Sequence, residues 1–567
     1  MPPALSRWLP RLLAMLSGGL LVFAYPRWSF EAVIWLWMLP LLAVLWPLPS
    51  VTPPRHPFRL GWLAGMAFFV PNLFWIRHSS RVFGGAVDNA WVGIGPELLG
   101  LGAVIGLSGC CALCFGAWAS FAVRVARPDF ARLASGSWQQ STWLSLRSAF
   151  LAAAAWVGLE WLRSMFLFSG FGWNGLGVGF HQNLVLIQAA DLVGVLGLSF
   201  LPVFVVCCGY NTAMRLVLVY RGQGACKSRL DFTFAMVLLL AVACYGYLKI
   251  GTEEKDPIKV RTVLIQTNIP QVVRWSGETT VEIYQRLAQL TRLYAEARNG
   301  KTSVDMVIWP ESALPINLFD VYNQLPPGEH VSYLNELLAA GDFSLVTGTD
   351  VLVPRDQAHT SVALLRGQVD ETFSSVQFYH KVNLVAFGEY LPLRNIPPFS
   401  WLKGVLPGDF VPGTQTEPLL LAKPAGVQLI PLICFEDTVG RLARRFVRDA
   451  PQIIVNVTND GWFLQSEEIE VHLANAKFRA IELRRPMCRA TNTGVTCFID
   501  TKGREVSRLA DPETKSTFIE GCLPGEILVP SKPVMTLYAR YGEWFPITLL
   551  ALSGIALLLR LTHRFGT

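Results

Sequence analysis

Long apolar runs occupy the two ends of the chain. A hydrocarbon core about 30 Å thick is crossed by roughly 20 mostly apolar helical residues. Runs that meet or approach this length occur at approximately 11–25, 31–48, 60–76, 92–123, 148–168, 187–212, 232–250 and 545–561. They predict a multi-pass α-helical membrane bundle of about eight spans, with residues 1–250 forming most of it and 545–561 forming the final helix.

The stretch 253–537 has the pattern of a soluble domain. Apolar runs of strand length, rich in Val and Ile, end in Pro, Gly, Asn or Asp and alternate with helical patterns. The strand-like runs are KVRTVLIQTNIP, SVDMVIWPES, FSLVTGTDVLV, TSVALLRG, GVQLIPLICFED and PQIIVNVTND, and the helical ones are VEIYQRLAQLTRLYAEARNG and HLANAKFRAIELRRP. This alternation predicts an α/β domain with helices covering sheet, and it leaves open whether there is one sheet or two.

Positive charge sets an expected orientation, because Lys and Arg are enriched in cytoplasmic loops. One set of alternate loops carries Arg7, Arg11, Arg55, Arg59, Arg124, Arg127, Arg132, Arg147, Arg215, Arg221, Lys227, Arg229, Arg560 and Arg564. The opposite set holds Arg27, Arg77, Arg81 and Arg163. The bias predicts a cytoplasmic N-terminus and an extracytoplasmic 253–537 domain. Because these loops account for much of the net charge of +7, that charge gives no argument for a nucleic-acid partner.

The cysteines show no metal-binding pattern. Of the eleven, seven lie in or beside apolar spans, and Cys434, Cys488, Cys497 and Cys522 lie in the soluble stretch without a CxxC or His-bearing spacing. We therefore expect no metal and no cofactor. In an oxidising compartment, two of the last three cysteines could form a disulfide.

Three predicted strands end in chemically active side chains. Glu311 follows a strand and a proline in VIWPESALP, Lys381 and Glu389 flank another apolar stretch in YHKVNLVAFGEYLPL, and Cys434 ends the strand of GVQLIPLICFEDT. Taken singly, a cysteine after a strand is more often inert core, and a strand-end Glu or Lys is more often solvated. Together they suit nucleophilic catalysis, with Cys434 as nucleophile, Glu311 as proton acceptor and Lys381 as the cation beside thiolate and oxyanion. A backbone N–H after Cys434 would be a second oxyanion donor.

The flanking motifs resemble a known group of enzymes. The order Glu, Lys, Cys and its spacing resemble the nitrilase superfamily. The motifs QTNIPQVVRW, HKVNLVAFGEYLPL, CFED, VNVTNDGWF and HLANAKFRAIELRRPMCRATNTGVTCFID, with EWLRSMFLFSGFGWNGLGVGFHQN and ADLVGVLGLSF in the apolar half, resemble the apolipoprotein N-acyltransferase family. The resemblance covers essentially the whole chain.

This resemblance implies a fold, an activity and a location. The soluble part would be a nitrilase-like (carbon-nitrogen hydrolase) αββα sandwich on the periplasmic side of the cell inner membrane. The enzyme would move a fatty acyl chain from a membrane phospholipid, through a cysteine thioester and by ping-pong kinetics. The acceptor would be the N-terminal amine of the diacylglyceryl-cysteine of apolipoproteins. The implied partners are thus phospholipid, diacylated apolipoprotein and membrane.

The resemblance also assigns residues. Glu311 would be the general base, Lys381 the oxyanion-side cation and Cys434 the acylated nucleophile. The supporting or substrate-binding positions are Glu389, Glu436, Phe435 and Trp275.

Two positions depart from the family pattern. Phe435 stands where many members have Tyr, and AHTSVALL carries Thr360 and Ser361 where members tend to have Asn. The first change keeps the aromatic ring and removes its hydroxyl, and the second requires a polar contact to be remade.

Other interpretations stay open on the sequence. A membrane-anchored nitrilase-type amidohydrolase would use the same triad, with water resolving the thioester. A transporter or channel with an accessory domain is disfavoured by the few charged residues in the predicted spans and the lack of an obvious pair of broken helices. In AAWVGLEWLRS, Glu160 and Arg163 either pair within one helical turn or contact a lipid headgroup.

Overall fold

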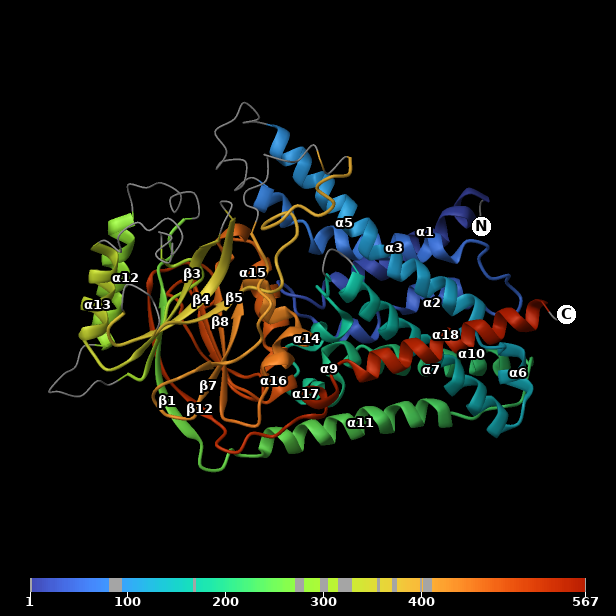
Figure 1. Cartoon of the computed structure of the whole chain (residues 1–567). Coiled ribbons are helices and arrows are strands. Elements are labelled where there is room, and N and C mark those ends of the chain that lie inside the picture. Colours follow the sequence, from blue (N-terminus) through green and yellow to red (C-terminus); the bar gives the residue numbers. More distant parts are fainter. Residues whose placement is uncertain are drawn as a thin grey trace. The chain divides into compact units, whose positions relative to one another are not determined.

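The chain divides into two compact units. The computed structural model describes residues 3–80, 94–166, 170–270, 280–295, 304–314, 329–353, 357–369, 375–397, 400 and 410–565. One unit comprises Met1–Arg77, Leu101–Gly251 and Tyr541–Thr567, and the other comprises His78–Gly100 and Thr252–Arg540. Figure 1 shows helices in the first unit and sheets covered by helices in the second.

The helical unit contains long apolar helices. Its helices are α1 (Pro3–Val22), α2 (Leu39–Leu45), α3 (Pro57–Asn72), α5 (Ile94–Phe121, which begins in the other unit), α6 (Phe130–Ser135), α7 (Trp138–Phe166), α8 (Leu184–Ile187), α9 (Ala190–Leu198), α10 (Phe200–Tyr220), α11 (Leu230–Gly251) and α18 (Trp544–Phe565). Among the described residues, five are long and apolar enough to cross a membrane: Glu97–Ala126, Trp138–Phe166, Phe200–Tyr220, Leu230–Gly251 and Trp544–Thr562.

Two predicted spans are interrupted. The run 31–48 forms a short 3-10 helix (Glu31–Trp35) followed by α2, in which Pro40 sits in the first turn, where its missing N–H costs no hydrogen bond. The run 187–212 is divided among α8, α9 and α10, and Gly194 inside α9 has a φ of 71°. The predicted count of about eight spans therefore stays a prediction.

Two six-stranded sheets form the centre of the second unit. The first has the order β12-β1-β2-β3-β4-β5 and the second β11-β10-β9-β8-β7-β6. The strands of the first are β1 (Ile258–Gln266), β2 (Met306–Ile308), β3 (Ser344–Val353), β4 (Gln357–Arg366), β5 (Gln377–His380) and β12 (Gly521–Val529). Those of the second are β6 (Leu419–Leu420), β7 (Gln428–Ile433), β8 (Gln452–Thr458), β9 (Met487–Thr491), β10 (Cys497–Ile499) and β11 (Glu505–Arg508). In each sheet three parallel strands, β1-β2-β3 or β7-β8-β9, are flanked by antiparallel ones.

The two sheets pack face to face between helical layers. One core joins the sheets through side chains such as Leu264, Ile308, Ile430 and Ile454. A separate core lies on the other face of the first sheet, where α12 (Thr280–Ala295) and α13 (Glu329–Ala339) cover it. Beside the second sheet lie α14 (Gly440–Ala443), α15 (Glu468–Ala476), α16 (Phe478–Leu483) and α17 (Leu537–Tyr541). Coverage on both faces explains the fully buried β8. The predicted α/β domain is confirmed, and it contains two sheets.

The cysteines are all free thiols. Cys488 and Cys497 lie buried on the neighbouring strands β9 and β10, and the thiol of Cys522 in β12 donates a hydrogen bond to the Leu290 carbonyl at 3.4 Å. The disulfide considered among these three is therefore not formed.

Candidate active site

Three strand ends bring Glu311, Lys381 and Cys434 together. Glu311 follows β2, Lys381 directly follows β5, and Cys434 directly follows β7 in the second sheet. Lys381 Nζ lies 3.6 Å from Glu311 Oε1, and a hydrogen bond joins the side chains of Glu311 and Cys434. Lys381 is fully buried and Glu311 is 7% exposed. A buried carboxylate, a buried ammonium and a partly buried thiol thus lie together at the ends of strands from the two sheets.

The turn that carries Glu311 depends on a glycine in the neighbouring strand. Gly348 of β3 donates its N–H to the Pro310 carbonyl at 3.1 Å and accepts from the Ala313 N–H at 3.1 Å. A Cβ at position 348 would lie 2.6 Å from Glu311 Cα, closer than real Cβ contacts occur. Sequence reasoning missed this residue, although a glycine inside the strand pattern FSLVTGTDVLV is a signal of close backbone approach.

Two carboxylates hold the Lys381 ammonium. Its Nζ lies 2.5 Å from Glu389 Oε1, and the other Glu389 oxygen accepts the Val385 N–H at 2.7 Å. Burial alone would lower the pKa of Lys381, but Glu389 and Glu311 more than offset it and raise that pKa above its ordinary value. The side chain is therefore a permanent cation at neutral pH.

The pKa values of Cys434 and Glu311 favour a resting thiol beside a proton acceptor. Burial and the Glu311 carboxylate raise the pKa of the Cys434 thiol well above its ordinary value. Burial also raises the pKa of Glu311 to about 7, although Lys381 opposes this shift. A thiol in this state needs a base to remove its proton before it can attack, and Glu311 is in contact with it.

Glu436 connects the loop after β5 with the end of β7. One carboxylate oxygen accepts the N–H groups of Val382 and Asn383 at 2.8 and 2.9 Å, and the other accepts that of Ile433 at 2.9 Å. The Tyr379 hydroxyl donates to both oxygens. Burial raises the pKa of Glu436 to about 7 against these donors, which favour the carboxylate. The residue therefore fastens the loops of Lys381 and Cys434 to each other.

The structure describes some of the remaining predicted positions and not others. Phe435 is partly buried and packs against the core between the sheets. Trp275 lies outside the described residues. At the Thr360–Ser361 departure, the Thr360 carbonyl accepts the Lys381 N–H at 2.8 Å, and the Ser361 hydroxyl lies 2.7 Å from His380 Nδ1. The main chain thus supplies a polar contact to Lys381 at this position.

Sequence reasoning also missed a group of buried charges next to Cys434. Asp437, Asp460, His472 and Arg489 are each at most 1% exposed and lie in mutual hydrogen-bond contact. The signal was charged residues within otherwise apolar strand and helix motifs, such as Arg489 in MCRAT. Among the described residues, no cluster of three or more His, Cys, Asp or Glu side chains has the arrangement of a metal site.

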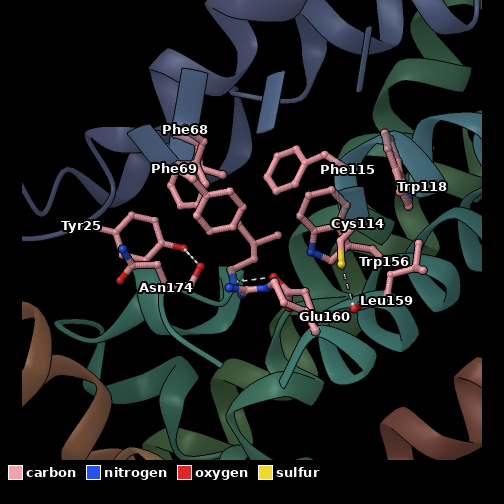
Figure 2. Close-up of a pocket in the computed structure, with 13 residues that line it drawn as sticks. Tyr25, Phe68, Phe69, Cys114, Phe115, Trp118, Trp156, Leu159, Glu160 and Asn174 are labelled. Atoms are coloured by element: carbon pink, nitrogen blue, oxygen red, sulfur yellow. Dashed lines mark hydrogen bonds between the residues drawn. The ribbon is translucent and has the colours of Figure 1, made fainter. Parts of the chain in front are cut away.

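In the helical unit, Glu160 and Arg163 bind the backbone of the loop that follows α7. Arg163 Nη1 donates to the Trp173 carbonyl at 2.6 Å, and Glu160 Oε1 accepts the Leu176 N–H at 2.8 Å. Figure 2 shows Glu160 in a pocket lined by aromatic rings, with the Tyr25 hydroxyl directed at Asn174. Arg163 also lines this pocket. The two charged side chains thus hold the Gly-rich loop, and their contact with a lipid headgroup stays a prediction.

Comparisons with known proteins identify the family of this chain. A family model described as the apolipoprotein N-acyltransferase N-terminal domain matches residues 17–208, and one described as carbon-nitrogen hydrolase matches residues 264–522. The chain is 32% identical to an apolipoprotein N-acyltransferase of Geobacter metallireducens over 94% of this chain and 92% of the relative. It is 31% identical to one of Rhodopseudomonas palustris over 88% of this chain and 85% of the relative. The chain therefore belongs to the apolipoprotein N-acyltransferase family of acyltransferases.

Proposed function

We propose that this acyltransferase loads a fatty acyl chain from a membrane phospholipid onto Cys434 and then passes it to the N-terminal amine of a diacylated apolipoprotein. The observation that carries the proposal is the contact of the Cys434 thiol with the buried Glu311, and of Glu311 with the buried Lys381. A thiol, a base of pKa about 7 and a fixed cation are the groups that acyl transfer through a thioester needs.

The first half-reaction breaks the phospholipid ester. Glu311 takes the thiol proton as Cys434 Sγ attacks the ester carbonyl, and the oxyanion that forms is stabilised by Lys381 and by a backbone N–H after Cys434. The intermediate collapses to the Cys434 thioester. Glu311 returns the proton to the departing oxygen, which releases a lysophospholipid.

The second half-reaction forms the amide. The amine of the diacylglyceryl-cysteine attacks the thioester carbonyl, and Glu311 accepts the amine proton. The carbon–sulfur bond breaks, and the proton passes to Cys434 to restore the thiol. Glu389 keeps the Lys381 ammonium in place, Glu436 and Phe435 support the loop of Cys434, and Trp275 contacts substrate.

We further propose a location for the two parts of the chain. Residues 1–250 and 545–561 would form a bundle of about eight spans in the inner membrane, with the N-terminus in the cytoplasm. The catalytic domain, residues 253–537, would lie in the periplasm. The five long apolar helices and the distribution of Lys and Arg support this arrangement.

The test is a half-reaction without acceptor. Purified full-length protein in detergent, incubated with a labelled phospholipid alone, should gain one acyl chain on Cys434 and release one lysophospholipid. A diacylated lipopeptide should discharge the adduct, and neutral hydroxylamine should remove it. Cys434→Ala should lose loading, whereas Cys522→Ala should keep it, because that half-buried thiol lies in β12 outside the candidate site.

Two results would contradict the proposal. Mapping of the acyl chain to another cysteine would remove Cys434 from the reaction. Discharge by water as fast as by lipopeptide would favour the membrane-anchored amidohydrolase.

A further inference from the structure

A cluster of four buried charges adjoins the nucleophile. Arg489 of β9 contacts the carboxylate of Asp437 through Nη1 and that of Asp460 through Nη2, the latter at 3.0 Å. His472 of α15 lies between the same two carboxylates, with Nδ1 2.9 Å from Asp460 and Nε2 3.0 Å from Asp437. We call Asp437, Asp460, His472 and Arg489 the charge cluster.

The charges of this cluster balance. His472 faces a carboxylate from each ring nitrogen, and its Nδ1 also lies 3.0 Å from Arg489 Nη2. Burial alone would lower the pKa of His472, but Asp437 and Asp460 raise it to about 9. Arg489 favours the ionised form of Asp460, whose pKa is lowered. With the pKa of His472 raised, the cations of His472 and Arg489 face the carboxylates of Asp437 and Asp460.

Hydrogen bonds connect the charge cluster to Cys434. Arg489 Nη1 donates to Asn456 Oδ1 at 2.9 Å, so that the amide nitrogen of Asn456 points the other way. That nitrogen donates to the Cys434 carbonyl at 3.2 Å and to the Leu432 carbonyl at 3.4 Å.

A second connection runs through Thr458 of β8. Its hydroxyl donates to Asp460 Oδ1 at 3.2 Å, and its side chain is hydrogen bonded to the Cys434 thiol. Asp437 itself belongs to the 3-10 turn Cys434–Thr438 that begins at the nucleophile.

The backbone of Cys434 needs such support. Its φ is 50°, in the left-handed region that a residue with a Cβ rarely adopts. Strained backbone of this kind persists only where the surrounding structure holds it from several sides. The direction of the Cys434 side chain and of the following N–H both depend on this conformation, so a small relaxation would move the thiol away from Glu311.

We propose that Arg489 and Asn456 are positioning residues for the reaction, with the charge cluster locking the Asn456 amide and that amide locking the left-handed backbone of Cys434. Neither side chain touches substrate; both act through the nucleophile. The inference rests on the proposed role of Cys434 as the acylated residue.

The test measures separately how much of the protein is active and the rate constant of acyl loading. In a single-turnover experiment with labelled phospholipid, the amplitude of acyl loading counts correctly folded sites, and the rate constant reports how well Cys434 is placed. Asn456→Asp keeps the shape and the acceptor for Arg489 but removes the donor to the Cys434 carbonyl. Arg489→Lys keeps one charge but loses the planar fork that reaches both Asn456 and the carboxylates.

For both variants we expect loading amplitudes near that of the unaltered protein and rate constants lowered by roughly 10- to 100-fold, the scale of a misplaced reacting group. The phospholipid concentration that gives half-maximal rate should not change. Arg485→Lys is the matched control, because Arg485 is also fully buried but donates to the carbonyls of Leu483, Arg484, Val534 and Arg448. This control should lose amplitude only.

The outcomes distinguish this inference from the proposed function. If Asn456→Asp loads Cys434 at the unaltered rate constant, the positioning role is wrong while the thioester stands. A fall in amplitude alone, as in the Arg485→Lys control, would make Asn456 and Arg489 purely structural. If Cys434→Ala still loads, the proposed function itself fails.

Discussion

At the residue scale, the proton affinity of Glu311 should govern the rate at which Cys434 is loaded with an acyl chain. Glu311→Gln retains the shape and removes the proton acceptor. We expect acyl loading of Cys434 to fall by roughly 10²–10⁴, the usual contribution of a general base. Quantitative mass spectrometry of the loaded protein would measure this loss. Near-normal loading by a folded variant would show that Glu311 has only a structural role.

The pH dependence of loading follows from the same residue. The raised pKa of Glu311, about 7, means that the carboxyl is protonated below this value and cannot accept the thiol proton there. The rate constant of loading should therefore rise as the pH increases through about 7. Lys381 keeps its charge across this range because its pKa is raised. A single-turnover profile that is flat between mildly acidic and mildly alkaline pH would argue against Glu311 as the base.

At the element scale, the approach of β3 to the turn after β2 should control the position of Glu311. Gly348→Ala adds a Cβ that would lie 2.6 Å from Glu311 Cα, so the turn must shift. We expect loading to slow by about tenfold or more, since reacting groups tolerate little displacement.

Gly521→Ala is the comparison for this change. Gly521 is also a strand glycine of the first sheet, and its added Cβ would meet a Leu509 methyl at 3.3 Å, which can move aside. Loading rate constants of the two variants should differ clearly. Equal rate constants would mean that the Gly348 contact does not position Glu311.

The elements also show what the sequence could reveal. Apolar runs ended by turn residues located β1, β2, β3, β4, β7 and β8, and the same pattern placed Glu311 and Cys434 after strands. Lys381 follows β5, a strand of four residues that was not among the predicted runs. The number of sheets could not be predicted, because buried strands of one sheet and of two have the same pattern. Gly348 and the charge cluster were missed because their roles depend on which strands are neighbours, and that is set by tertiary pairing. Prolines and glycines within apolar runs, such as Pro40 and Gly194, were the available signs of interrupted helices.

At the scale of the whole molecule, the proposed membrane topology can be tested directly. A reporter enzyme fused after Asp256 should report an extracytoplasmic location. A reporter fused near Lys227 should report the cytoplasm, because the intervening α11 is long and apolar enough to cross the membrane once. Localisation of both fusions to the same side would overturn the proposed span assignment.

The pairing of β1 with β12 has a consequence for how this chain can be rearranged. Ile258, shortly after α11, is the partner of Val529, shortly before α17, so the sheet-bearing segment Thr252–Arg540 begins and ends near adjacent positions of one antiparallel ladder. Facing residues in such a ladder are only about 5 Å apart. A domain with neighbouring ends can be inserted into, or removed from, a host chain without stretching it. The segment Thr252–Arg540, which holds both sheets of its unit, is therefore suited to exchange between host chains as a single piece.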